Sequence, residues 1–225
     1  MYFPESYYNE YTNSYCEKIG QDTRGIIKYN FNNCGFINNL NYNIEEENAI
    51  CFFGSAITSC IGLPWESSFA YKLSQQLKSK KYKAYNFSQG CMFVDNAEIV
   101  KTVELTKNIK NFKPIAYVIQ FIGLDRRFNI KYKNGTLNIN QEDNLKLFLE
   151  LFKKLEKILK NDQWIFFGCD GSESDIPVDI KEHKNCLIWN PPLIDKLLRD
   201  VPGPKFHEMI SFGLKNKFKT LYNIE

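Results

Sequence analysis

Three serines follow apolar runs of strand length, and they are the first residues in this chain that could carry out covalent chemistry. Ser55 and Ser59 come after one such run, and Ser88 comes after the next. His207 lies near the start of the last amphipathic segment. A serine hydroxyl can attack an ester when an imidazole takes its proton and a carboxylate orients the ring. One interpretation is therefore ester hydrolysis by one of these serines with His207 as base. The other is that His207 packs or caps within a helix.

A second polar set follows the most apolar run, residues 115–121. Gly123, Asp125 and Arg126 stand where this run ends, and a further arginine comes next. Asp125 could pair with the arginines at the end of a strand. Alternatively, a guanidinium at this place could bind a carboxylate or a phosphate.

The elements that must position these residues are strands and helices in alternation. The predicted strands are 49–53, 82–87, 115–121, 163–168 and 186–189, and the predicted helices are 65–78, 95–110, 142–160, 193–199 and a last one that ends near residue 221. This pattern predicts an α/β fold, a three-layer α/β/α sandwich with about five parallel strands, right-handed crossovers and helices on both faces. In such a sheet the chemistry lies at the carboxyl ends of the strands.

Two segments are expected outside the sheet. Residues 1–48 are polar and rich in Tyr and Asn, so we expect an N-terminal arm packed on an α/β domain of residues 49–225, with a short hairpin near residues 25–31. Residues 128–139 alternate around an Asn-Gly pair, which predicts a second hairpin, inserted on the site side of the sheet.

Composition excludes several classes of function. The chain has 225 residues, 44% of them hydrophobic, and no apolar run approaches the roughly 20 residues of a membrane span. The first residues show no basic region followed by an apolar one, so we expect no secretory signal and a cytoplasmic or virion-associated protein. The net charge is +3 with lysines spread along the chain, which does not favour nucleic-acid binding.

The cysteines favour neither disulfides nor a metal. There are seven, with no Cys-x-x-Cys pair, and only two histidines, so we expect reduced core cysteines and no zinc site. The acidic loop 169–175 lacks the spacing of an EF-hand. We therefore expect no metal and no cofactor.

The segment after the first strand resembles the first motif block of the SGNH (GDSL-like) hydrolases, in which Gly-Asp-Ser-x-Thr is followed by Gly-Leu-Pro. Here the corresponding residues are Gly54-Ser55-Ala56-Ile57-Thr58 and then Gly62-Leu63-Pro64. In this frame the acidic position of the family falls on Ser55 and its nucleophilic serine falls on Ala56. The resemblance implies the flavodoxin-like SGNH hydrolase fold without its nucleophile.

Two further strand ends resemble the oxyanion-binding blocks of that family. Gly90 matches the glycine whose amide helps to form the oxyanion hole. Gly123 and Asp125 match the third block, but no asparagine stands between them. The resemblance implies a candidate cleft that also includes Ser88 and Arg126.

The segment Pro202-Gly203-Pro204 with His207 resembles the fifth block of the family. Aligned on these residues, the catalytic histidine position falls on Val201 and its aspartate position falls on Leu198. Neither side chain can carry a proton. Loss of a nucleophile or a base removes several orders of magnitude of rate, so this reading implies an SGNH-like domain without esterase catalysis.

Three functions remain open at this point. The first is binding of a glycan, an acyl group or a protein by a catalytically silent domain. The second is an active SGNH-type esterase or acetyl-hydrolase with a rearranged site, built from one of the three serines and His207. The third is a structural or assembly role, for example in a virus or phage, with the arm docking on a neighbour. The oligomeric state is not predicted.

Overall fold

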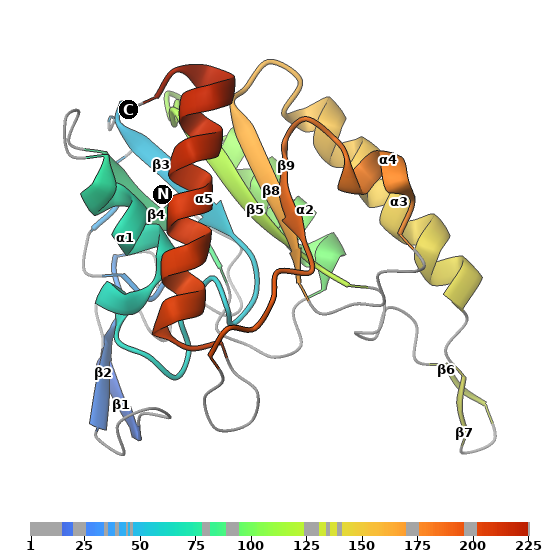
Figure 1. Ribbon diagram of the computed structural model, residues 1–225, viewed down its shortest axis with the longest axis horizontal. Coiled ribbons are helices and arrows are strands. Elements are labelled where there is room, and N and C mark those ends of the chain that lie inside the picture. Colours follow the sequence, from blue (N-terminus) through green and yellow to red (C-terminus); the bar gives the residue numbers. More distant parts are fainter. Residues whose placement is uncertain are drawn as a thin grey trace.

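The sheet and its connections are taken from a computed structural model. It describes residues 15–19, 26–33, 36–38, 41–43, 45, 47–77, 82–88, 95–123, 131–133, 136–138, 141–169, 176–195 and 202–224. The described ranges hold the main sheet, two small antiparallel ribbons and the helices that cover the sheet (Figure 1).

The main sheet has five strands and all of its pairs are parallel. The strands are β3 (Ala49–Phe53), β4 (Lys83–Asn86), β5 (Ala116–Ile122), β8 (Trp164–Cys169) and β9 (Cys186–Trp189), in the spatial order β4-β3-β5-β8-β9. The predicted α/β fold with a five-stranded parallel sheet is confirmed. Strands β3 and β9 have the predicted bounds. Each end of β4, β5 and β8 differs from the predicted end by one residue.

The central strands are buried on both faces. Every residue of β3, β5 and β8 is buried, which explains why their sequences are continuous apolar runs rather than alternating ones. Gln120 is the polar exception in β5, and it is fully buried. Such a residue must find hydrogen-bond partners inside the protein.

Two pairs of helices form the outer layers. On one face α1 (Phe69–Gln76) packs beside α5 (Pro204–Tyr222), and on the other α2 (Asn96–Lys107) packs beside α3 (Gln141–Ile158). Two core clusters lie between these layers and the sheet. One contains buried side chains of α2 and α3, and the other contains those of α1 and α5.

Two predicted helices differ from the structure. The predicted helix 65–78 is a 3₁₀ turn, η2 (Trp65–Ser67), followed by α1. The break occurs because Ser68 is extended and its hydroxyl accepts a hydrogen bond from the Tyr71 amide at 3.0 Å, so it caps a new helix. Residues 193–195 of the predicted helix 193–199 are not helical, and residues 196–199 lie outside the described ranges. The short helix α4 (Val178–Lys181) was not predicted.

The two ribbons are antiparallel hairpins. One pairs β1 (Tyr15–Ile19) with β2 (Ile26–Asn30), and the other pairs β6 (Lys131–Lys133) with β7 (Thr136–Asn138). The hairpin predicted at 128–139 is confirmed. Residues 26–30, where the other short hairpin was predicted, form a single strand that pairs with the earlier strand β1. In Figure 1 both ribbons lie at the lower end of the view, the end toward which the strands of the main sheet run.

Residues before β3 are bound to the edge strand β4. The side-chain amide of Asn38 donates to the Ala84 carbonyl at 2.8 Å, and the side-chain amide of Asn86 donates to the Ile37 carbonyl at 2.9 Å. The Tyr42 hydroxyl also donates to the Asn86 carbonyl. These contacts cover one side of the edge strand. The division into an arm (1–48) and a domain (49–225) stays a prediction.

The described cysteines are reduced. Cys51, Cys60, Cys169 and Cys186 are buried and form no disulfide, so they are core residues, as predicted for Cys51, Cys169 and Cys186. Within the described ranges, no helix is long and apolar enough to cross a membrane.

Candidate functional site at the carboxyl edge

The loop after β3 lies at the point where the sheet reverses its winding. The chain crosses from β3 to the edge strand β4 through α1, and it reaches β5, on the other side of β3, through α2. In open α/β sheets ligands bind at this reversal, beside the carboxyl ends of the two neighbouring strands. Residues 54–64 after β3 and Gly123 after β5 stand at this place.

Gln120 holds the first turn of this loop. Its side-chain oxygen accepts hydrogen bonds from the Thr58 hydroxyl at 2.7 Å and from the amide and hydroxyl of Ser55, both at 3.3 Å. Its side-chain nitrogen lies 3.0 Å from the Ser55 hydroxyl. A Cβ atom at Gly54 would lie 2.3 Å from the Thr58 hydroxyl and 2.7 Å from the Gln120 Cβ. The turn therefore requires glycine and closes on a buried amide that sequence reasoning missed.

Ala56 is the residue of this turn that solvent reaches. It is partly exposed, whereas Gly54, Ser55 and residues 57–60 are buried. The residue that the sequence resemblance places at the nucleophile position is therefore the partly exposed one, and it carries only a methyl group. The hydroxyl beside it, on Ser55, is turned inward to Gln120.

The other two candidate hydroxyls are bound to each other and to β4. The Ser59 and Ser88 oxygens lie 2.8 Å apart, and both side chains are buried. The Ser88 hydroxyl also donates to the side-chain oxygen of Asn86, which accepts the Ser88 amide at 3.0 Å as well. Asn86 was missed because a polar residue at a strand end gives no signal of its partner.

His207 lies in the first turn of α5 and contacts the loop from the side. Its Nδ1 accepts a hydrogen bond from the Phe69 amide at 3.3 Å, and its Nε2 lies 3.9 Å from the Cys60 sulfur. The ring stacks on the Phe69 ring at 5.7 Å between centroids. Because Nδ1 already accepts, the neutral ring carries its proton on Nε2. This arrangement leaves no free lone pair for a serine proton.

Burial also determines the charge of this ring. Desolvation lowers the pKa of His207 to about 4, against an ordinary value of 6.5; the Asp195 carboxylate raises the pKa and Lys72 lowers it, each by less. The ring is therefore neutral at physiological pH. His207 joins the loop, α1 and α5 as an uncharged packing residue.

The predicted nucleophiles and the predicted base make their hydrogen bonds to other residues. Within the described part of the chain, no hydrogen bond joins His207 to Ser55, Ser59 or Ser88. Five predicted site residues lie outside the described ranges: Gly90, Asp125, Arg126, Leu198 and Val201. Gly123 is described, and its amide donates to the Cys169 carbonyl at 2.7 Å, which joins the ends of β5 and β8.

Asp195 supports the start of α5 and was also missed. Its carboxylate accepts the amides of Lys205 at 2.8 Å and Phe206 at 2.9 Å. A Cβ atom at Gly203 would lie 2.3 Å from this carboxylate. The Pro-Gly-Pro segment therefore has a local structural role, because its glycine lets the Asp195 carboxylate approach the first amides of the helix.

A cavity of about 360 Å³ lies at the same edge. It is lined by Ile57 of the loop, Cys169 at the end of β8, Phe206 of α5 and residues 190–193 after β9. No cluster of three or more His, Cys, Asp or Glu residues that could hold a metal was found in the described ranges.

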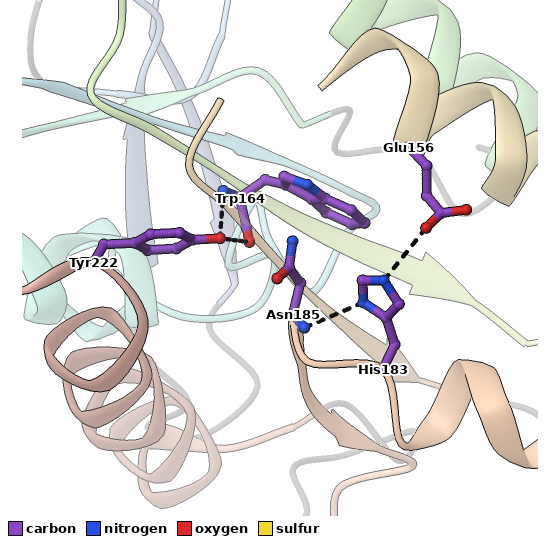
Figure 2. Close-up of polar contacts among 5 residues, drawn as sticks. All are labelled: Glu156, Trp164, His183, Asn185 and Tyr222. Atoms are coloured by element: carbon purple, nitrogen blue, oxygen red, sulfur yellow. Dashed lines mark hydrogen bonds and ion pairs between the residues drawn. The ribbon is translucent and has the colours of Figure 1, made fainter. Parts of the chain in front are cut away.

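The second histidine, His183, lies at the end of the sheet opposite the candidate site, where β8 and β9 begin (Figure 2). Its Nδ1 accepts the Asn185 amide at 3.1 Å, and its Nε2 lies 3.3 Å from the Glu156 carboxylate of α3. Figure 2 also shows the Tyr222 hydroxyl, which accepts the Trp164 amide at 3.1 Å and donates to the Trp164 carbonyl at 2.7 Å. His183 thus lies away from the candidate site.

Comparisons with solved structures identify the fold, whereas comparisons of the sequence identify no family. No family model matches the chain, and no curated protein matches it. Solved structures do match. A carbohydrate esterase family 2 enzyme with a carbohydrate-binding domain, from Myceliophthora fergusii, has a TM-score of 0.53 and 11% identity, covering 80% of this chain and 68% of that one.

Two further solved structures match over nearly the whole of their own chains. The psychrotrophic esterase EstA of a Pseudoalteromonas species has a TM-score of 0.50 and 13% identity, covering 79% of this chain and 100% of that one. The protein TesA has a TM-score of 0.50 and 12% identity, covering 77% of this chain and 99% of that one. The chain therefore shares the α/β fold of these solved structures. At these identities the likeness concerns the fold alone.

Proposed function

We propose that this protein is a ligand-binding domain with an SGNH-hydrolase-like fold and without esterase catalysis. The observation that carries the proposal is the chemistry of the loop after β3. Within its first turn the partly exposed residue is Ala56, whose methyl group cannot attack a carbonyl, and the neighbouring hydroxyls are engaged with Gln120 and Asn86. Ester hydrolysis needs a free hydroxyl beside a free imidazole.

The state of His207 supports the same proposal. A general base needs a lone pair within hydrogen-bond reach of the proton that it takes. The Nδ1 lone pair accepts the Phe69 amide, and Nε2 faces a thiol. The imidazole is thus used in packing, and Val201 occupies the position that the family alignment assigns to a catalytic histidine.

The ligand classes follow from the neighbours and the cavity. The Myceliophthora fergusii enzyme is described as a carbohydrate esterase with a carbohydrate-binding domain, which makes an acylated glycan one candidate. The hydrocarbon side chains in the lining of the cavity, those of Ile57, Leu193 and Phe206, make an acyl group another. A protein partner is the third candidate, and no nucleic acid is proposed.

Hydrolysis of short p-nitrophenyl esters tests the proposal. We expect the purified protein to release p-nitrophenol at the rate of the buffer, because losing nucleophile and base removes several orders of magnitude of rate. EstA, which shares the fold, is the positive control. Turnover that an organophosphate inhibitor abolishes would refute the proposal.

The alternative is an esterase with a rearranged site. It is favoured by the three hydroxyls that gather at the carboxyl edge, on Ser55, Ser59 and Ser88. If turnover is found, the variants S55A, S59A and S88A separate the possibilities. Loss of activity in one of them, together with loss in H207Q, would establish a rearranged pair.

A structural or assembly role, for example in a virus or phage, is the second alternative. The β1–β2 ribbon supports this alternative, because it lies outside the main sheet, at the lower left of Figure 1. Removal of residues 1–28 should then abolish self-association in sedimentation while the circular dichroism of the sheet domain is retained. Location in the cytoplasm or in a virion stays a prediction.

A further inference from the structure

We propose that the described residues 29–33, 36–38 and 41–43 form a strap that holds the loop after β3 in a closed conformation, and that release of this strap opens the candidate site. The inference concerns regulation of the site to which the proposed function assigns a ligand, and it rests on that proposal. Three observations carry it: two separate hydrogen-bonded connections between the strap and the loop, and a loop backbone that needs support from its surroundings.

The first connection joins Tyr29 of β2 to the loop. The Gly62 amide donates to the Tyr29 hydroxyl at 2.7 Å, and both residues are buried. The amides of residues 59–61 and 63 are bonded to carbonyl groups inside the loop. The Gly62 amide is therefore the one in this stretch that is bonded outside the loop. Without Tyr29 a buried donor would lose its partner.

The second connection is a chain of polar groups that passes the end of β4. The Ile37 carbonyl accepts the side-chain amide of Asn86 at 2.9 Å, and the Asn86 side-chain oxygen accepts the Ser88 amide and hydroxyl. The Ser88 oxygen lies 2.8 Å from the Ser59 oxygen of the loop. The strap thus reaches the loop at Ser59 as well as at Gly62.

The backbone of the loop is left-handed at two positions in this stretch. Cys60 has a φ of 59° and Gly62 has a φ of 96°. Glycine adopts such values readily, whereas a cysteine keeps them only where its surroundings hold it. The conformation of the loop at Cys60 therefore depends on the contacts on either side of it, at Ser59 and Gly62.

The strap can leave β4 without separating two strands of the main sheet. It is not a strand of that sheet, and it is bonded to β4 through side chains, those of Asn38, Tyr42 and Asn86. Ring contacts complete the attachment, because Phe36 and Tyr42 pack against Phe87 with centroids 5.3 Å and 5.0 Å away.

Release would change what the loop offers to a ligand. In the closed conformation the Ser59 and Ser88 hydroxyls bond to each other, and the Gly62 amide bonds to the strap. Once the strap leaves, the Gly62 amide becomes an available donor, and Asn86 is no longer tied to Ile37 and need not hold Ser88. These polar groups could then bind a ligand at the carboxyl edge, so the strap acts as an autoinhibitory contact.

Cys60 can report the opening of the loop. It is 1% exposed, and its sulfur lies 3.6 Å from the Pro64 carbonyl and 3.9 Å from the His207 ring nitrogen. The thiol can react with N-ethylmaleimide only when the loop opens. Cys51 of β3 is fully buried, so it reacts only when the sheet unfolds and is the internal reference. Mass spectrometry of the labelled peptides measures the two rates separately.

Matched tyrosine variants test the first connection. Y29F removes the acceptor of the Gly62 amide and should raise the labelling rate of Cys60 about tenfold, the factor to which loss of one buried hydrogen bond corresponds. Y82F is the control. Tyr82 is 5% exposed and belongs to the same core cluster as Tyr29, but its hydroxyl makes no hydrogen bond in the part of the chain that the structure describes. Y82F should leave the Cys60 rate unchanged.

S88A tests the second connection. It removes the hydroxyl that joins Asn86 to Ser59, so it should also raise the labelling rate of Cys60 while Cys51 stays slow. Because it acts at the other connection, it also tests the strap if Y29F does not fold.

The outcomes separate the strap from the proposed function, because labelling uses neither a ligand nor an ester. An unchanged Cys60 rate in Y29F and S88A, an equal rise in Y82F, or a parallel rise at Cys51 would overturn the inference and leave a silent domain possible. Ester turnover by the unmodified protein would refute the proposed function, whereas a selective rise at Cys60 would still establish the strap.

Discussion

Gln120 illustrates how single residues determine the candidate site. It stands in the middle of an apolar strand, and its amide satisfies the hydroxyl of Thr58 and the amide and hydroxyl of Ser55. The residues that resemble a hydrolase motif are therefore held by a side chain 62 to 65 positions away. At the residue scale, the Gln120 side chain therefore determines both the shape of this turn and the direction of its hydroxyls.

Replacing this amide should destabilise the protein. Q120L leaves buried donors of Ser55 and Thr58 without a partner, and each unsatisfied group costs about 1–3 kcal/mol. We expect the free energy of unfolding, measured with urea, to fall by about 2–4 kcal/mol. T58V, which removes one donor together with its bond, should cost less. Equal stability of Q120L and the unmodified protein would contradict this role.

At the scale of the elements, both ends of α5 are attached to the rest of the fold by hydrogen bonds. At its start Asp195 accepts two of the first amides of the helix, and at its end Tyr222 binds both backbone polar groups of Trp164 in β8. Figure 2 shows the second attachment. Because the helix lies across the sheet between these points, its first turn, with Phe206 and His207, is held beside the candidate site.

Removing the first attachment should weaken α5. D195A leaves the Lys205 and Phe206 amides to water, and loss of such a capping side chain costs about 1 kcal/mol. We expect a lower urea midpoint and faster hydrogen exchange in the first turn of α5 than in α1. D195N retains one acceptor oxygen and should lie between the two proteins. Unchanged exchange in D195A would rule out this role.

At the scale of the whole molecule, the fold buries an ionisable ring at the junction of three elements. His207 contacts α1 through the Phe69 amide and the loop through Cys60, and Asp195 and Lys72 are the charged groups that affect it. A histidine that is neutral when folded and charged when unfolded makes stability depend on pH.

Stability should therefore fall in mild acid. The pKa of His207 is lowered from 6.5 to about 4, so the ring's contribution is fully present above pH 6.5 and is lost as the pH falls, because the unfolded chain binds a proton that the folded chain does not. The free energy of unfolding should therefore be about 3 kcal/mol lower at pH 4 than above pH 6.5. Urea midpoints between pH 7.5 and 4 measure it. H207Q should lower stability at pH 7.5 and show a smaller loss toward pH 4; parallel curves would contradict the assignment.

Local pattern was sufficient for the elements of the sheet. The run Ala49–Phe53 is strand β3, because a strand buried on both faces must be continuously apolar. The run Cys186–Trp189 is β9, an edge strand whose last three residues are partly buried. The Asn-Gly hairpin and the last helix were predicted for equally local reasons. Ser68 was not recognised as a helix start, because the apolar spacing of residues 65–78 continues through it while its own backbone is extended.

The amino-acid sequence by itself predicted the five parallel strands, most of the helices that cover them and the reduced core cysteines. The frame that places Ala56 at the serine position of a hydrolase motif stays a prediction from the sequence. Only the tertiary structure decided which partners the candidate site residues bind. Gln120, Asn86 and Phe69 reach Ser55, Ser88 and His207 through hydrogen bonds whose partners were not evident from local pattern. Periodicity reports which face of an element is buried, whereas the partner of a buried polar group depends on how the elements pack.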